Sequence, residues 1–308
     1  MKLSIVIPSY GREQVLVDTI TALEPQRRAL GCSSELLVID QSPSHEPPIE
    51  RALQLLQQAG RLRWLRLSRP HLTRAMNTGL LLARGELVLF LDDDIAPAPD
   101  LLLGHLRAHQ RFDRAWAVVG QILQPGQRPL PLPPGPPRPV LWRDLDFPFN
   151  SSLGAWIENA MAGNLSLKRK RALDVGGFDE RFPPPVAFRF ETEFAKRLIA
   201  AGGAIRFAPE ASLHHLRAPA GGTRSAGSHL TSASGHHGVG DCYYALRCGR
   251  GLQRSWYLIR RPLREVRTRF HLRHPWWIPV KLLGELRAFN QALRLSRHTP
   301  LLLHGQGT

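Results

Sequence analysis

The segment "ELVLFLDDDIAP", residues 86–97, places three adjacent carboxylates directly after a run of apolar residues. An apolar run of this length without polar alternation indicates a strand buried on both faces. Asp92, Asp93 and Asp94 repel one another whenever they are ionised together. The segment therefore predicts the end of a buried parallel strand, with positive charge held beside the three carboxylates.

Four short apolar runs indicate strands in the first hundred residues. They lie at residues 3–7, 35–39, 61–67 and 86–91. Three intervening segments carry apolar residues at helical spacing, at about 12–30, 46–59 and 72–83. Alternation of strand and helix predicts an α/β fold, in which a mostly parallel sheet is flanked by helices.

Polar residues follow each of these runs, and in a parallel sheet they meet at one edge. They are Pro8-Ser9-Tyr10, Asp40-Gln41-Ser42, Ser68-Arg69 and Asp92-Asp93-Asp94. Ligands of such sheets bind beyond the carboxyl ends of the strands. Carboxylate oxygens suit Mg²⁺ or Mn²⁺, which bridge to diphosphate oxygens. The alternative is that the carboxylates are solvated turn residues or caps of the next helix.

The remainder of the chain mixes long loops with ordered segments. Residues 124–148 are rich in proline and indicate a surface loop. "AMAGNLSLK", residues 160–168, indicates a strand, and residues 189–203 indicate a helix that ends at a glycine pair. Residues 216–240, rich in Gly, Ser and His, have the length of a functional lid.

Seven blocks occur in an order and spacing that resemble family 2 glycosyltransferases with the GT-A fold. They are "VIPSYGR", "LLVIDQS", "AMNTGL", "ELVLFLDDD", "GNLSLKR", "GGFDERF" and "FETEFAKRL". The resemblance covers residues 1–215. It implies a Rossmann-like sheet and an inverting transfer from a nucleoside-diphosphate sugar, with a divalent metal, Mn²⁺ or Mg²⁺, on the diphosphate.

The resemblance also implies residues that bind the donor. Pro8, Tyr10 and Arg12 fall on the family's first nucleotide-binding loop. Asp40 matches the carboxylate that accepts a hydrogen bond from a pyrimidine N3–H, which would favour a UDP- or dTDP-sugar. Asn77 falls on the Asn-x-Gly helix block, although the Arg that usually precedes it is Met76 here. Asp92 and Asp93 belong to the same predicted donor site.

Two further roles follow from the resemblance. The acceptor hydroxyl needs a base, and "RFETEF" aligns Glu191 with that base, with Glu193 as the second choice. An acid that only stabilises the start of a helix is the alternative for Glu191. Asp92 and Asp94, together with His215 of "APEASLHHL", are the predicted metal ligands. A structural role is the alternative for His215.

Charge distinguishes the end of the chain. The 308 residues carry a formal net charge of +16. After residue 240 there are thirteen Arg or Lys residues against three acidic ones, interleaved with Trp256, Tyr257, Trp276 and Trp277. This pattern favours an anionic lipid surface as a partner. The alternative is a helical extension packed on the domain.

We expect a catalytic domain at 1–240 and a basic amphipathic extension at 241–308. The catalytic domain is divided into a nucleotide-binding half at 1–120 and an acceptor half with the lid loop at 121–240.

The cysteines and the start of the chain bear on location. Cys32, Cys242 and Cys248 are too few for a disulfide framework, which favours a reducing compartment. Neither an N-terminal leader nor an apolar run of membrane-spanning length is visible. We therefore expect a cytoplasmic enzyme that can lie on the inner face of the cell membrane.

The predicted function is metal-assisted, inverting transfer of a sugar to a hydroxyl of a glycan or lipid-linked acceptor. One alternative is a nucleotidyltransferase acting on sugar phosphates, although "PSYGREQ" is a poor match to the Gly-rich basic loop of that class. The other is a nucleic-acid-binding protein, suggested by the net charge. The chain has no recognisable nucleic-acid module, so we expect no such partner.

Overall fold

The computed structural model describes residues 2–133, 147–222 and 227–303. Its centre is one nine-stranded sheet, with the order β3-β2-β1-β4-β8-β6-β9-β5 and with β7 paired to β9. The strands are β1 (Leu3–Ser9), β2 (Ser34–Asp40), β3 (Arg63–Arg66), β4 (Leu87–Leu91), β5 (Ile95–Pro97), β6 (Ala115–Leu123), β7 (Ala155–Ile157), β8 (Asn164–Lys168) and β9 (Ala204–His215).

The α/β class is confirmed, and the first half of the sheet is parallel as predicted. β1 pairs in parallel with β2 and with β4, and β2 pairs in parallel with β3. The second half corrects the expectation of a mostly parallel sheet, because β8 runs antiparallel to both β4 and β6. No described helix separates β6, β7 and β8 along the chain, and strands joined without a helical crossover can pair antiparallel.

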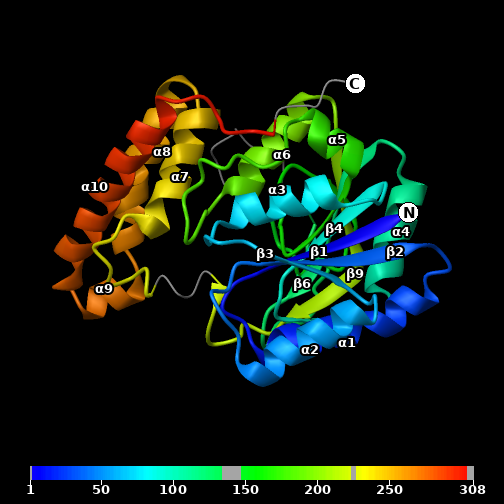
Figure 1. Ribbon diagram of the computed structural model, residues 1–308. Coiled ribbons are helices and arrows are strands. Elements are labelled where there is room, and N and C mark those ends of the chain that lie inside the picture. Colours follow the sequence, from blue (N-terminus) through cyan, green and yellow to red (C-terminus); the bar gives the residue numbers. More distant parts are fainter. Residues whose placement is uncertain (1, 134–146, 223–226, 304–308) are drawn as a thin grey trace.

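Helices cover both faces of the sheet (Figure 1). α1 (Gln14–Ala29), α2 (Pro47–Gln58) and α4 (Leu101–Arg111) bury apolar side chains in one core, and α3 (Leu72–Leu82), α5 (Arg169–Asp174) and α6 (Phe190–Ala200) in the other. Alternate residues of β1 supply both cores, since Ile5 and Ile7 join the first and Val6 the second. This double burial explains why the strand sequences are continuously apolar.

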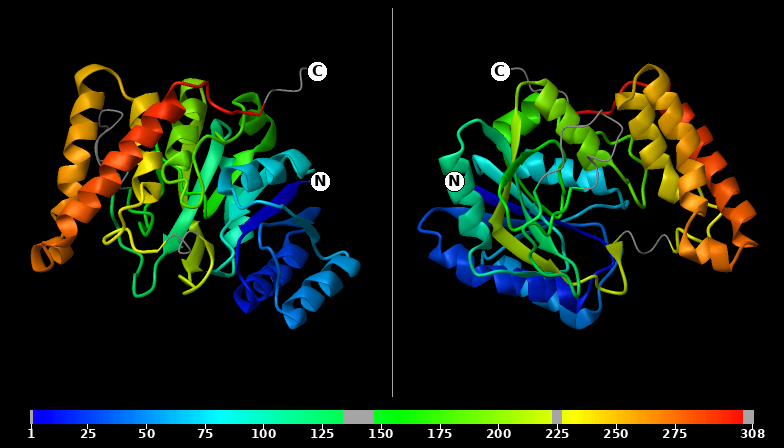
Figure 2. Two further views of the ribbon diagram at one scale, coloured as in Figure 1. Left: turned by 60° about the vertical axis from the view of Figure 1, so that its left-hand side comes forward. Right: turned by 180° about the vertical axis from the view of Figure 1, so that it is seen from behind.

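A separate group of helices, here called the helical unit, lies beside the sheet (Figure 2). It comprises α7 (His236–Cys248), α8 (Gly251–Val266), α9 (Arg269–Arg273) and α10 (Trp277–Ser296). α10 packs along α7, which also contacts α6. The boundary that we expected between residues 240 and 241 falls inside α7. Parts of both predicted long loops, residues 134–146 and 223–226, lie outside the described residues.

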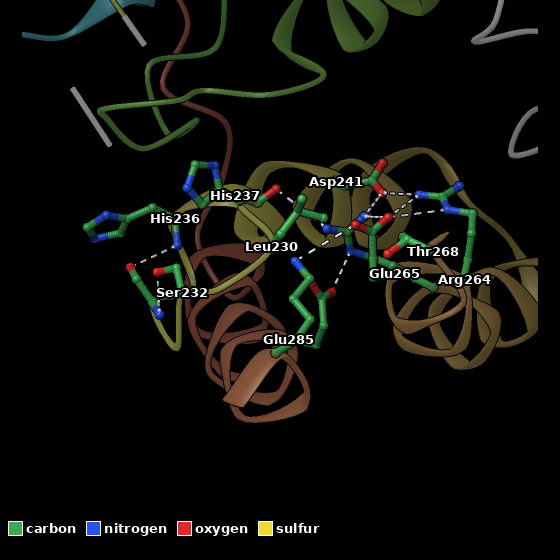
Figure 3. A network of polar contacts seen from close by, with 12 residues as sticks. Leu230, Ser232, His236, His237, Asp241, Arg264, Glu265, Thr268 and Glu285 are labelled. Carbon is green, nitrogen blue, oxygen red and sulfur yellow. Dashed lines mark hydrogen bonds and ion pairs between the residues drawn. The ribbon is translucent and has the colours of Figure 1, made fainter. Parts of the chain in front are cut away.

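Buried charge joins the helical unit to the rest of the protein. Asp241 of α7 is fully buried and forms ion pairs with Arg189, at 3.2 Å, and with Arg261 of α8. The Tyr257 hydroxyl donates to the same carboxylate at 2.6 Å. Figure 3 shows Asp241 and Arg264 directed toward each other in this network. The described residues form no helix that is both long and apolar enough to cross a membrane.

Candidate active site

A cavity of about 440 Å³ opens at the carboxyl edge of the parallel strands. Its walls come from the loop after β1, the residues after β4, the start of α3 and the end of β9. The lining includes Pro8, Ser9, Tyr10, Arg12, Gln41, His71, Asp92, Asp93, Asp94 and His215. Residues predicted from four separate segments therefore share one cavity, as the sheet-edge argument required.

The positive charge beside the three carboxylates comes in part from the protein itself. Arg12 is buried, with Nε 3.0 Å from Oδ1 of Asp93 and Nη2 3.1 Å from Oδ2 of Asp94. Ser9 Oγ donates to Oδ2 of Asp93 at 2.8 Å. Two of the three acids are thus paired with one guanidinium. Burial nevertheless raises the pKa of Asp93 to about 6, against the opposing effects of Arg12 and Ser9.

Arg12 also fixes the chain that follows β9. Its guanidinium donates to the carbonyl oxygens of Ala218, at 3.3 Å, and of Ala220. The Gly222 N–H donates to the Tyr10 carbonyl at 2.7 Å. Gly221 has φ +81°, and a Cβ there would lie 2.3 Å from the Gly11 carbonyl oxygen. The described part of the predicted lid loop therefore lies directly against the loop after β1.

Asp94 and His215 form one pair that can hold a cation. His215 Nδ1 lies 3.0 Å from Oε1 of Gln124, and its Nε2 lies 3.1 Å from Oδ1 of Asp94. When Nδ1 carries the proton, Nε2 presents a lone pair to the carboxylate, and two acceptors this close require a proton or a cation between them. Neutral imidazole and carboxylate are both common metal ligands, so the pair fits a divalent ion.

Asp92 was the third predicted ligand, and its role as a ligand stays a prediction. Its carboxyl lies beside Gly163, where a Cβ would come within 2.2 Å of Oδ2. In the part of the chain that the structure describes, no three His, Cys, Asp or Glu side chains converge on one metal position. The structure brings Asp94 and His215 within 3.1 Å of each other, and Asp92 lines the same cavity.

Asp40 and Asn77 also differ from expectation, because neither lines the cavity. Asp40 has no exposed surface, and it accepts hydrogen bonds from Trp64 Nε1 at 3.0 Å and from the Ser42 N–H at 2.8 Å. His45 Nε2 lies 2.8 Å from the same carboxyl. Asn77 is buried too, and its amide exchanges hydrogen bonds with the backbone of Phe178. Both side chains are committed to holding the fold.

Glu191 stands in the first turn of α6, close enough to Asp92 for that charge to influence it. Burial is the main reason that its pKa rises from 4.5 to about 7, and repulsion from Asp92 adds to the rise. A carboxyl group with a pKa near neutrality is suited to accept a proton from a hydroxyl. Glu193 is unsuited, because Arg197 binds both of its oxygens at 2.6 and 2.8 Å.

Three lining residues had no individual role in the sequence analysis. Ser9 and Gln41 followed predicted strands, and the structure adds their contacts: Ser9 holds Asp93, and Gln41 Oε1 accepts the His71 N–H at 2.6 Å. His71 went unnoticed. It directly precedes α3, and its position after the third strand was the available signal.

The fold, with an acid-lined cavity at the carboxyl edge of its strands, is the fold of the GT-A glycosyltransferases. The description "Glycosyl transferase family 2" belongs to the family model that matches residues 4–174, more than half of the chain. The chain therefore belongs to glycosyl transferase family 2.

Particular proteins are similar to parts of the chain. "Uncharacterized glycosyltransferase YfnE" of Bacillus subtilis (strain 168) is 29% identical over 111 residues, which cover 36% of this chain and 27% of that protein. The chain thus matches about a quarter of that relative's length.

Two solved structures share the fold. S. aureus TarS 1-349 in complex with UDP-GlcNAc has a TM-score of 0.54 and 14% identity, covering 84% of this chain and 70% of that one. Mannosyltransferase PcManGT from Pyrobaculum calidifontis, in complex with GDP-Man and Mn²⁺, has a TM-score of 0.52 and 17% identity, covering 96% and 73%. At such identities the likeness concerns the fold alone.

Proposed function

We propose that the protein catalyses inverting transfer of a sugar from a nucleoside-diphosphate sugar to a hydroxyl group of a glycan or lipid-linked acceptor. One observation carries the proposal: Glu191, with a pKa of about 7, lies near Asp92, which lines a cavity formed by the acidic cluster and the loop after β1. A proton acceptor close to one of the acids that line a nucleotide-sized cavity meets the two main requirements of this reaction.

The donor would occupy the cavity between the acidic cluster and the end of β1, which includes Pro8, with Tyr10 in the loop that follows. A UDP- or dTDP-sugar is our first choice, and support comes from TarS 1-349, which was solved with UDP-GlcNAc. The buried Asp40 gives no support to a pyrimidine preference. A GDP-sugar is therefore a real competitor, as the complex of PcManGT with GDP-Man illustrates.

Asp94 and His215 would hold the divalent ion. Mn²⁺ is the first ion to test, because PcManGT was solved with it. When bound, the ion supplies positive charge that stabilises the departing diphosphate. Arg12 already contributes such charge between Asp93 and Asp94.

In the proposed step Glu191 supplies the base, and the bond that forms at the anomeric carbon is matched by the bond that breaks. The Glu191 carboxylate takes the proton of the acceptor hydroxyl, and the hydroxyl oxygen forms a bond to the anomeric carbon. The bond from that carbon to the diphosphate oxygen breaks on the opposite face, and the diphosphate leaves with the electron pair. Attack opposite the leaving group inverts the anomeric configuration. Burial of Glu191 keeps its carboxylate basic enough for the transfer.

The proposed acceptor is inferred from the positive charge at the end of the chain and not from the residues that line the cavity. The basic region after residue 240 favours an acceptor presented at the inner face of the cell membrane, such as a lipid-linked intermediate of an envelope polysaccharide. Family membership leaves the nucleotidyltransferase and the non-enzymatic nucleic-acid-binding alternatives without support.

A donor panel tests the proposal. Purified protein is incubated with UDP-, dTDP- and GDP-sugars, with Mn²⁺ or with chelator, and the released nucleoside diphosphate is measured. We expect metal-dependent release from one donor class. Calorimetry should show that Glu191→Gln binds this donor as the wild type does, although its turnover is lost. If no donor binds with either Mn²⁺ or Mg²⁺, or if Glu191→Gln retains full activity, the proposal fails.

A further inference from the structure

The apolar side of α8 faces solvent instead of the protein core. Leu252, Trp256, Ile259 and Leu263 recur at a spacing of three or four residues and therefore share one helix face. Their exposed fractions are 89%, 55%, 61% and 48%. Among the sixteen residues of α8, all within the described ranges, the buried one is Arg261. Four large apolar side chains of α8 thus face solvent, while Arg261 of the same helix is buried.

The inward side of α8 explains this orientation. Arg261 forms ion pairs with Asp241 of α7 and, at 2.9 Å, with Glu285 of α10. Lys281 binds Glu285 at 2.8 Å from the same helix. Figure 3 shows Asp241, Glu265 and Glu285 gathered between the helices. Because these charges are paired inside the helical unit, α8 cannot rotate its apolar face inward without burying unpaired charge.

α10 extends the same apolar surface. Leu282, Leu286 and Leu293 of α10 are 39%, 56% and 37% exposed. A groove of about 310 Å³ between the two helices is lined by Ile259 from α8 and by Leu282 and Leu286 from α10. The exposed apolar residues of both helices therefore open to the same side. We call this surface, formed by Leu252, Trp256, Ile259, Leu263, Leu282, Leu286 and Leu293, the apolar face.

Arginines border the apolar face on its outer edges. Leu258 and Pro262 line the groove, so helical geometry places the exposed Arg260 on the opposite edge of α8, and the exposed Arg267 follows the end of the helix directly. The same geometry places the exposed Arg287 and Arg294 on the edge of α10 away from the groove. A strip of leucine and tryptophan bordered by arginine matches a lipid interface, where apolar side chains enter the acyl boundary and cations meet anionic headgroups.

We propose that the apolar face of α8 and α10 inserts into the surface of an anionic lipid bilayer. The inference rests on the proposed place at the membrane and is separate from the transfer chemistry. The flanking arginines favour lipid over a second copy of the chain, because two such basic edges would repel each other. They also favour it over nucleic acid, which would leave the exposed leucines without a partner.

Flotation with vesicles tests the proposal on the full chain. Vesicles contain either zwitterionic lipid alone or about one third anionic lipid. The apolar variant carries Leu252→Ser, Trp256→Ser and Ile259→Ser. Its matched control carries Leu55→Ser, Leu81→Ser and Leu130→Ser, which replace three exposed leucines outside the apolar face. The charge variant carries Arg260→Gln and Arg267→Gln, and its control carries Arg51→Gln and Arg107→Gln on α2 and α4.

We expect the wild type and both controls to float with anionic vesicles. The apolar variant should lose about tenfold or more in bound fraction, and the charge variant should lose binding in a salt-dependent way. Hydrolysis of the donor in solution should be unchanged in all variants, which separates this proposal from the proposed function.

Three results would each overturn the assignment. The wild type could fail to float with anionic vesicles, or the apolar variant could float as well as the wild type. Ultracentrifugation could instead show a wild-type dimer that the apolar variant converts to a monomer, in which case the apolar face joins two copies of the chain.

Discussion

Replacing Glu191 by Gln should stop sugar transfer and at the same time stabilise the fold at alkaline pH. Glutamine keeps the size of the side chain and the hydrogen-bonding capacity of the neutral acid, but it cannot carry the negative charge. Loss of a general base typically lowers a rate by about 10²- to 10⁴-fold. The gain in stability follows from the environment that raises the pKa of this group.

The magnitude follows from that pKa. Burial raises the pKa of Glu191 from 4.5 to about 7, so the folded state holds the proton more tightly than the unfolded state does. The resulting stabilisation is complete below pH 4.5 and is lost as the pH rises through about 7. At about 1.4 kcal/mol per pKa unit the ionised group costs up to about 3 kcal/mol at pH 8. Partial exposure of the side chain reduces this to about 2 kcal/mol.

Glu193→Gln is the matched control on the same helix. Glu193 is buried and paired with Arg197, so its neutral replacement removes a charged hydrogen bond and should destabilise the protein by about 1.5–3 kcal/mol. The two substitutions thus change the free energy of unfolding in opposite directions, although each replaces one Glu by one Gln within the first turn of α6.

Urea denaturation at about pH 5 and about pH 8 measures both effects. Relative to wild type, Glu191→Gln should gain stability between the two pH values, while Glu193→Gln should be destabilised at pH 8. Transfer assays on the same preparations give the loss of activity. A Glu191→Gln variant with the same pH dependence of stability as wild type would show that the carboxyl group is not held in an environment that favours its neutral form.

Further predictions concern the pH profile, the metal, Arg12 and Asp241. The rate of transfer should rise with pH through about 7, because only deprotonated Glu191 accepts the proton; a flat profile from pH 5 to 9 would contradict this. Asp94→Asn and His215→Ala should each abolish the thermal shift that Mn²⁺ and donor produce together, whereas Asp92→Asn should keep part of it. Arg12→Gln should lower the free energy of unfolding by about 3–5 kcal/mol, measured in urea, because it leaves two buried carboxylates without their cation. Asp241→Asn should destabilise the protein by a similar amount, and stability equal to wild type would refute the buried network.

The sequence was most informative where both faces of a strand are covered. β1, β2 and β4 are continuously apolar because helices pack on each side of them, so their positions could be predicted to within two residues. β3 is shorter than predicted, since its alternation with arginine marks an edge strand that is only half buried. The antiparallel β8 carries no local signal of its direction, which depends on pairing partners that are distant in sequence.

α7 was missed in part because glycine normally indicates a loop. Gly238 and Gly240 lie in its first half and serve close packing. A Cβ on Gly240 would lie 2.1 Å from the Phe188 carbonyl oxygen, and one on Gly238 would lie 2.8 Å from Cβ of Ala288. Glycine stands at these two helical positions because α10 and the chain before α6 occupy the space of a side chain. No local pattern shows such a requirement.

Some features of the candidate site could be predicted from the sequence, and others could not. Proximity of the loop after β1 and the three aspartates followed from sheet topology, whereas His215 was placed with them by the family resemblance. The pairing of Arg12 with Asp93 and Asp94 did not, because it depends on side-chain conformations across two loops. The burial of Asp40 needs Trp64 of the neighbouring strand and His45 of the next loop, which only the folded chain brings together.

Asp241 links the apolar face to the proposed base. It holds Arg189, which has a left-handed backbone with φ 73° immediately before α6, and Glu191 follows two residues later. The same carboxylate holds Arg261, whose inward position keeps the apolar side of α8 outward. Cutting the chain after residue 240 would divide α7 and leave Arg189 without its buried acid. Loss of activity in such a truncation would therefore reflect a displaced start of α6 as much as a lost membrane contact, and surface substitutions on α8 separate the two.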